Sequence, residues 1–211
     1  SLRPEGRETV VEDARSPWRD GPFLFLICLV FLLAMFFLQV WITYPIYLRE
    51  FYGLGERSVG LLMGFNAALI VVFEMVLLRR VEHFDQMKIA GVGALLIGLG
   101  LGLLPLGETM LFALMLAAVW TVGEMLNLPM SNAVVAARAG RTSAGRYMGA
   151  YTLAFATAFV VSPLLGSAVY ERLGPDVLWY SIGCCGLVVA LGYRLLAGRV
   201  SAAAGSVTPE D

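Results

Sequence analysis

Six apolar stretches of 18 to 27 residues divide the chain, and short charged segments separate them. A helix needs about 20 mostly apolar residues to cross the hydrocarbon core of a membrane, so each stretch is close to this length or exceeds it. Among the charged residues, only Glu74 and Glu124 fall clearly inside a stretch. The sequence therefore predicts an all-α membrane protein whose six transmembrane helices lie at residues 22–48, 58–78, 89–106, 110–135, 147–170 and 177–196.

The composition supports this prediction and excludes other classes of protein. Hydrophobic residues make up 59% of the 211 residues, and charged residues make up 15%. Soluble domains carry roughly 25% charged residues. The net charge of −1 also gives no basic surface for nucleic acid. An ordinary soluble domain, a disordered chain and a nucleic-acid-binding protein are therefore excluded. The cysteines (Cys28, Cys184 and Cys185) are expected to be free thiols.

Positive charge is distributed unevenly between the two sides of the predicted bundle. Twelve Lys and Arg residues lie on the side of the two chain ends, and three lie on the other side. The positive-inside rule therefore places both termini in the cytoplasm and the bundle in the cell (inner) membrane. We expect residues 1–21 to form a flexible cytoplasmic linker, residues 22–197 the membrane bundle, and residues 198–211 a cytoplasmic tail.

Polar side chains recur at helical spacing on four of the six spans. Strongly polar groups in lipid cost several kcal/mol, so these faces should turn towards a protein interior or a water-filled cavity. The residues concerned are Gln39, Thr43 and Tyr47 in the first span, Asn66 and Glu74 in the second, Trp120, Glu124, Asn127 and Ser131 in the fourth, and Tyr151, Phe155, Ala158 and Ser162 in the fifth.

The third and sixth spans instead carry ridges of small residues, which are surfaces for close helix packing. Ala94, Gly98 and Gly102 form one ridge, and Gly183 and Gly186 belong to the other. The order of polar and small-residue spans repeats as two sets of three. Because three helices per set turn the second copy upside down, the pattern predicts two inverted three-helix repeats, an arrangement that recurs in transporters.

Four short segments carry recognisable motifs. The segment from Trp120 to Pro129 contains Thr-Val-Gly-Glu-Met, Gly145 begins Gly-Arg-Tyr-Met-Gly, and Ser162 precedes Pro-Leu-Leu-Gly. Trp-Arg-Asp-Gly-Pro-Phe, starting at Trp18, ends the polar N-terminal region. In order and spacing these segments resemble the tenth helix, the eleventh helix and the central linker of a major facilitator superfamily transporter. The resemblance is strongest to the bacterial drug:proton antiporter branch and covers the C-terminal half of such a protein.

This resemblance implies half of a twelve-helix fold, in which two six-helix bundles surround a central cavity and work by alternating access. It also implies that the first, second, fourth and fifth helices of each half line that cavity. The family's loop signature is eroded between Glu74 and Lys88, where its glycines are missing. The implied partner is an N-terminal six-helix half. The chain is then either an excised half of a longer polypeptide, which we favour, or a half-size protein that pairs with a separate chain.

Glu124 is the main candidate for proton coupling. A carboxylate near the middle of the membrane can hold a proton in its neutral form and release it when water arrives. The alternative is that Glu124 only braces neighbouring helices. For Glu74 an ion pair or gate latch is the favoured role. Residues of opposite charge near the cytoplasmic ends of the spans would complete such a gate, namely Arg79, Arg80 and Arg146.

The cavity residues predicted for substrate or proton are Glu124, Asn127, Trp120, Asn66, Gln39, Thr43, Tyr47 and Tyr151. Trp41 and Tyr44 would either join an aromatic pocket or lie in the interfacial belt. His83 has no second ligand nearby in the sequence, and no catalytic constellation is present. We therefore predict no enzyme activity, no metal and no cofactor.

The sequence thus predicts secondary-active transport of a small organic molecule, as drug or metabolite efflux, with protons as the coupling ion. The expected partners are the other six-helix half, the lipid bilayer, the substrate and protons. A membrane scaffold or receptor subunit, and less favourably an intramembrane enzyme, are the alternatives.

Overall fold

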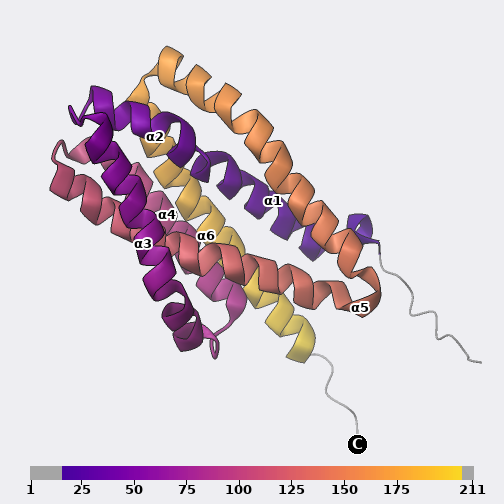
Figure 1. Ribbon diagram of the computed structural model, residues 1–211. Helices are drawn as coiled ribbons and strands as arrows, with labels where there is room; N and C mark the ends of the chain where they lie inside the picture. The colour runs from indigo at the N-terminus through magenta and orange to yellow at the C-terminus, as the bar shows by residue number, and fades with distance from the viewer. Residues whose placement is uncertain (1–15, 206–211) are drawn as a thin grey trace, which may run out of the picture.

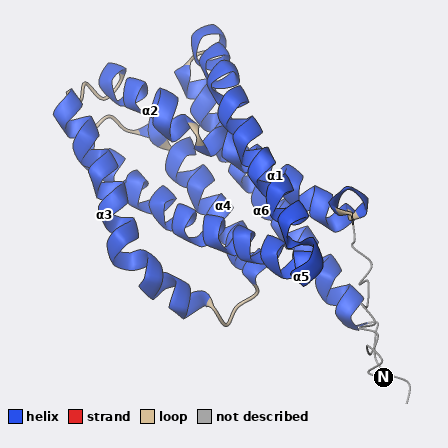
Figure 2. Cartoon of the chain, turned by 45° about the vertical axis from the view of Figure 1, so that its right-hand side comes forward, coloured by secondary structure: helices blue, strands red, loops and turns tan. Residues whose placement is uncertain are grey.

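The computed structural model describes residues 16–205, together with their side chains except those of 140–142 and 199–205. All elements within this range are helical (Figure 2). They are η1 (Pro17–Arg19), α1 (Gly21–Phe37), α2 (Gln39–Glu50), α3 (Glu56–Val81), α4 (Gln86–Gly102), η2 (Leu104–Leu106), α5 (Met110–Leu173) and α6 (Pro175–Gly205).

Six helical segments of the described chain are long and apolar enough to cross a membrane. They are Gly21–Glu50, Glu56–Val81, Gln86–Leu106, Met110–Ala139, Ser143–Leu173 and Pro175–Gly198. The number and order of the predicted spans are confirmed, and most observed spans extend up to about a turn beyond the predicted ends. Most of the predicted linker (1–15) and the end of the predicted tail (206–211) lie outside the described residues.

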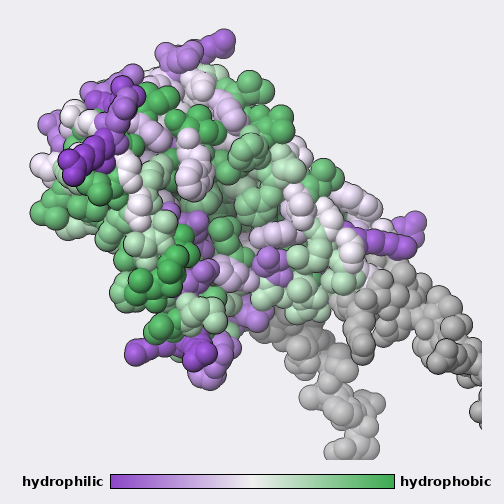
Figure 3. All heavy atoms as spheres, in the orientation of Figure 1, coloured by the Kyte–Doolittle hydropathy of each residue, from purple (hydrophilic) through white to green (hydrophobic). Residues whose placement is uncertain are grey.

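α5 contains two spans, which we call its first span (Met110–Ala139) and second span (Ser143–Leu173). The two meet at an angle at one end of the bundle (Figure 1). α1 begins and α6 ends at this same end, which we call the terminal face; the opposite end, where α2 ends and α3 begins, is the distal face. Hydrophilic residues gather mostly at the ends of the molecule, with apolar residues between them (Figure 3).

α4 lies at the centre of the bundle because glycines let its neighbours approach closely. A Cβ added to Gly93 or Gly100 would stand 2.6 Å from backbone atoms of the first span of α5. On another side of α4, Gly98 and Gly102 meet Gly186 and Gly183 of α6, again with no room for a Cβ. The small-residue ridges predicted for the third and sixth spans therefore pack against each other, as such ridges do between membrane helices.

The first span is broken, which the sequence analysis did not predict. α1 ends at Phe37 and α2 begins at Gln39, so the two meet at Leu38. Pro45 lies inside α2 and cannot donate a backbone hydrogen bond, which weakens the helix further along. Near the break, the Ser162 hydroxyl of α5 donates to the Met35 carbonyl at 2.7 Å. A side chain from a distant helix thus contributes a hydrogen bond where the first span changes direction.

Two spans are poorly covered by the rest of the chain. In the most apolar window of α3 only 11% of the residues are buried, and in that of the second span of α5 only 22%, whereas the other four reach 50–56%. The exposed apolar side chains include Val71, Val72 and Phe73 of α3 and Phe159, Val160 and Leu164 of α5. These two spans therefore present apolar surface that the six-helix bundle does not itself bury.

Candidate functional site

Glu124 lies near the middle of the first span of α5 and contacts α3 through one side chain. Asn66 of α3 donates one amide hydrogen bond to Oε2 of Glu124 and another to Oγ1 of Thr121, each at 3.0 Å. Thr121 donates its own proton to the Ala117 carbonyl at 2.6 Å, so its oxygen is the acceptor towards Asn66. The arrangement joins two spans through a carboxylate, an amide and a hydroxyl.

The environment of this group is intermediate between core and surface. Asn66 is 5% exposed and Thr121 is fully buried, whereas Glu124 is half-buried. Among the described residues, Oε1 of Glu124 has no hydrogen-bond partner. Glu74 is also half-buried and lies two turns further along α3. The sequence analysis named Asn66 and Glu124 but missed Thr121, which its position three residues before Glu124 on the same face could have revealed.

The other predicted residues of this helix face the bundle core. Asn127 donates to the Ala90 carbonyl of α4 at 2.8 Å, and the Ser131 hydroxyl lies 2.7 Å from Oη of Tyr193 on α6. Trp120 is 1% exposed and its backbone lies against Gly100 of α4. These residues share one helical face, which turns towards α4 and α6 and, at Trp120, towards Tyr44 of α2. Glu124 and Thr121 contact α3 through Asn66. Helical phase groups residues on a face but does not identify the neighbour of each.

Gln39 and Thr43 form a second buried polar group, between α2 and the second span of α5. Nε2 of Gln39 donates to both the carbonyl and the hydroxyl of Ser162 at 2.8 Å. Thr43 donates to Oε1 of Gln39 at 3.1 Å. All three side chains are at most 2% exposed. The structure therefore brings Gln39 and Thr43 together with Ser162, at the contact between α2 and the second span of α5. Glu124 lies at a different contact, between α3 and the first span of α5.

The candidate aromatic residues divide between the core and the surface. Tyr44 and Tyr47 pack edge-on against Trp179 of α6, with ring centroids 6.2 and 5.3 Å away, and Tyr44 also packs against Trp120 at 6.3 Å. Trp41 is 60% exposed. The cluster is closed, because Tyr44, Trp120 and Trp179 are each at most 1% exposed. Tyr151 is elsewhere, beside Phe155 at 5.2 Å.

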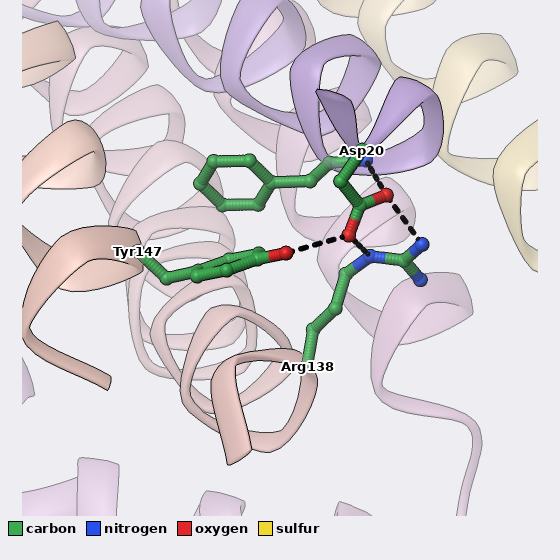
Figure 4. A network of polar contacts seen from close by, with 4 residues as sticks. Asp20, Arg138 and Tyr147 are labelled. Atoms are coloured by element: carbon green, nitrogen blue, oxygen red, sulfur yellow. Dashed lines mark hydrogen bonds and ion pairs between the residues drawn. The ribbon is translucent and has the colours of Figure 1, made fainter. Parts of the chain in front are cut away.

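The predicted gate residues make no ion pair in the described part of the chain. Glu74 is half-buried, and Arg79, Arg80 and Arg146 are exposed near the terminal face. A half-buried ion pair at this face joins two other residues, Asp20 and Arg138 (Figure 4). Arg138 donates from Nε to Oδ2 of Asp20 at 2.7 Å and from a terminal nitrogen to Oδ1 at 2.6 Å. From the sequence, the positive-inside rule is the favoured role of Arg138 and gate pairing the alternative, and Asp20 is not named as its partner.

Asp20 accepts two further hydrogen bonds at this point. Its Oδ1 caps α1 by accepting from the Phe23 amide at 3.2 Å, and its Oδ2 accepts from the Tyr147 hydroxyl at 3.0 Å (Figure 4). Burial opposes ionisation of this carboxyl, but the hydrogen bonds from Arg138, Phe23 and Tyr147 and the Arg138 charge outweigh it and hold the pKa of Asp20 below its ordinary value. One carboxylate thus ties the start of α1 to both spans of α5.

Two cavities of the described chain lie away from Glu124. One of about 640 Å³ opens at the terminal face between the α3–α4 turn, α5 and α6, where its lining includes His83, Phe84 and Arg138. A second, of about 230 Å³, lies near the distal face between α2 and the second span of α5. No group of three His, Cys, Asp or Glu residues that could hold a metal ion occurs within the described range.

The amino-acid sequence of the chain is similar to those of known membrane transporters. Residues 2–163 match the family model of the Major Facilitator Superfamily. A "Na(+), Li(+), K(+)/H(+) antiporter" of Planococcus maritimus is 23% identical over 206 residues, which cover 91% of this chain and 46% of the antiporter. An "Uncharacterized MFS-type transporter YhjO" of Bacillus subtilis (strain 168) is 22% identical over 170 residues, which cover 81% of this chain and 42% of that protein. The chain spans about half the length of the relatives it matches. Family and relatives point to membrane transport rather than to an enzyme.

Proposed function

The chain belongs to the major facilitator superfamily, and we propose that it forms the C-terminal six-helix half of a proton-coupled secondary-active transporter that works by alternating access. The observation that carries this proposal is the hydrogen bond between Glu124 and Asn66, which joins two membrane spans through an ionisable group. Ionisable residues within membrane spans are costly and commonly mark proton or ion pathways.

Asn66 is suited to serve a carboxyl group in either protonation state. Its amide nitrogen donates to the carboxyl group of Glu124 in this structure and can do so when that group is ionised, while its amide oxygen can accept from a protonated carboxyl after a rotation of the side chain. Thr121 holds the other amide proton of Asn66 and orients it. Glu124 can therefore lose or gain a proton and keep a hydrogen bond to Asn66 of α3. The unpartnered Oε1 is the atom at which we propose the proton is exchanged.

The uncovered spans support a second six-helix half as partner. α3 and the second span of α5 expose apolar side chains, and both relatives are about twice as long as this chain. A bundle that provides only one wall of a central cavity would leave such faces open. The other half, on the same polypeptide or as a separate chain, would cover them and complete the cavity beside Glu124.

Two substrate classes are consistent with this proposal. The family resemblance favours a small organic molecule, moved outwards as in drug efflux. The Planococcus maritimus relative is named for exchange of Na⁺, Li⁺ or K⁺ against protons, which favours a monovalent cation as the second candidate. In both cases the driving force would be the proton gradient. We propose that the terminal face is cytoplasmic and the distal face external, in the cell membrane.

The experiment that tests the two-half proposal compares flux from the chain alone and from the chain paired with its other half. Reconstituted alone in proteoliposomes as a monomer, the chain should show no substrate flux above that of empty vesicles. Co-expression with the N-terminal half should restore flux driven by a pH gradient. Strong flux from isolated monomers would contradict the proposal and indicate a self-sufficient six-helix carrier.

A further inference from the structure

The cavity of about 230 Å³ near the distal face adjoins the buried polar group of Gln39, Thr43 and Ser162 and lies away from Glu124. α2 contributes Thr43, Ile46 and Glu50 to its wall, and the second span of α5 contributes Ser167, Tyr170 and Glu171. These residues come from two helices that are joined by the hydrogen bonds between Gln39 and Ser162. We call the space between the two helices, on the distal side of these bonds, the wedge.

The polar lining of this wedge is made of oxygen atoms alone. Five of its six side chains end in a carboxylate or a hydroxyl, and no Lys or Arg belongs to the lining. Arg49, the nearest cation along α2, lies 3.6 Å from Glu56 of α3 instead. Glu50 and Glu171 therefore give the cavity two formal negative charges that no lining residue neutralises. Carboxylate and hydroxyl oxygens are the ligands that hard cations prefer.

Hydrogen bonds hold three of these oxygen-bearing side chains, those of Thr43, Glu50 and Tyr170, in place. The Tyr170 hydroxyl donates to Oε2 of Glu50 at 2.8 Å, which links the two walls across the cavity. At the inner end, Thr43 is 98% buried and gives its single proton to Gln39 at 3.1 Å, so its oxygen can offer only lone pairs to the cavity. Because Gln39 is itself bonded to Ser162, the width of the wedge is set by buried contacts.

The size of the cavity limits the class of ligand. Pockets for drug-sized molecules run roughly 300–1,000 Å³. A volume of about 230 Å³ falls below that range but exceeds what a bare metal ion needs. A small ammonium compound or an alkali-metal ion with part of its water shell would fit, whereas a large aromatic drug would not.

We propose that this cavity is an external holding site for a small monovalent cation on its way to or from the transport pathway. The carboxylates of Glu50 and Glu171 provide the attraction, and the Thr43 and Ser167 oxygens replace part of the water shell of the cation. A cleft lined with one sign of charge raises the local concentration of the opposite ion. This inference rests on the proposed transport function, and it assigns a cationic substrate to it.

The test uses the complete transporter in nanodiscs, with radioactive sodium ion and radiolabelled tetramethylammonium as separate probes. Glu50→Gln and Glu171→Gln should each raise the dissociation constant of the bound cation about tenfold, the change expected for the loss of one close charge contact, and the double variant should abolish saturable binding. Glu56→Gln is the matched control, because Glu56 pairs with Arg49 of α2 but does not line the cavity. The Glu56→Gln variant should bind the cation with the wild-type dissociation constant. An unchanged melting temperature shows that each variant is folded.

Transport assays then separate this inference from the function on which it rests. In proteoliposomes the two Gln variants should show a higher KM for cation presented at the distal face and an unchanged kcat. Absence of binding by the wild type, or equal affinity in wild type and double variant for both probes, overturns the cation site even if another substrate is transported. Binding that follows the predicted pattern without any transport supports the site and refutes the transport function. Preference for one probe identifies the cation as an alkali metal or an ammonium compound.

Discussion

Gln39 of α2 and Gly166 of α5 share one space, because the Gln39 amide lies where a Cβ at position 166 would stand. A side chain at position 166 would therefore displace the Gln39 amide from its hydrogen bonds to the carbonyl and hydroxyl of Ser162. This contact joins the broken first span to the second span of α5. It also forms the inner end of the oxygen-lined cavity.

The close contact predicts a specific pattern of stability in single and double variants. Gly166→Ala should lower the free energy of unfolding by about 1–3 kcal/mol, the usual cost of overpacking a buried site, seen as a lower melting temperature in detergent. In a Gln39→Ala background the same Gly166→Ala change should cost less than about 0.5 kcal/mol, because the clash is gone.

Gly149 provides the matched control for this cycle. It lies on the same helix, and a Cβ there would meet nothing within 4 Å. Gly149→Ala should therefore leave the melting temperature unchanged or slightly raised, since Ala favours helix more than Gly does. If Gly166→Ala lowered the free energy of unfolding equally in both backgrounds, the added methyl group would not be clashing with Gln39.

The Asp20–Arg138 pair predicts a pH-dependent contribution to stability. Because the pKa of Asp20 in the folded protein lies below its ordinary value, the ionised carboxylate stabilises the fold at neutral pH, and this contribution is lost as the pH falls through the folded pKa. Asp20→Asn should therefore cost about 1.5–3 kcal/mol at neutral pH, the value of a hydrogen bond to a charged group. The difference from wild type should shrink once the pH falls below about 4.

Glu56→Gln is the comparison for this measurement, because the Arg49–Glu56 pair is largely exposed, at 58% and 84% of the two side chains. Its effect at neutral pH should be close to zero, as for most surface ion pairs. The measurement is the thermal unfolding of wild type and both variants in detergent, repeated from neutral to acidic pH. An Asp20→Asn penalty that stays constant down to strongly acidic pH would mean that the charge of Asp20 does not contribute.

Much of the fold could be predicted from the sequence, because the membrane imposes a length requirement on every span. The six spans, their order and the glycine contacts of α4 with α6 follow from apolar length and small-residue spacing. The break at Leu38 could not be predicted from Pro45, which lies seven residues further on. A hydrogen bond near the break comes from Ser162, which is 127 residues from Met35 in the sequence.

The candidate site could be predicted only in part, and for a similar reason. Helical phase groups Trp120, Glu124, Asn127 and Ser131 on one face, but it carries no information on which neighbour that face meets. The Asp20–Arg138 pair joins residues 118 positions apart. Asp20 followed by a glycine and a proline was a readable signal for a helix start, whereas its partner could be identified only from the tertiary structure.

The proposed orientation predicts a labelling pattern for single cysteines. With Cys28, Cys184 and Cys185 replaced by Ser, a cysteine placed within residues 53–56 should react with an impermeant thiol reagent added outside intact cells. A cysteine placed within residues 140–144 should react only after the membrane is permeabilised. The physical reason is the twelve-to-three distribution of Lys and Arg between the two sides. The reverse pattern would place the terminal face outside.

The most direct test of the account is Glu124→Gln in the complete transporter, because the amide keeps the size and hydrogen bonding of the carboxyl but cannot titrate. Asn66 can still donate to the Gln oxygen, so the contact with α3 should survive. We predict that the variant binds substrate and exchanges it across the membrane, but no longer accumulates it against its gradient when a pH difference is imposed. Accumulation at the wild-type level, with the wild-type dependence on pH, would contradict the assignment of Glu124 as the proton carrier.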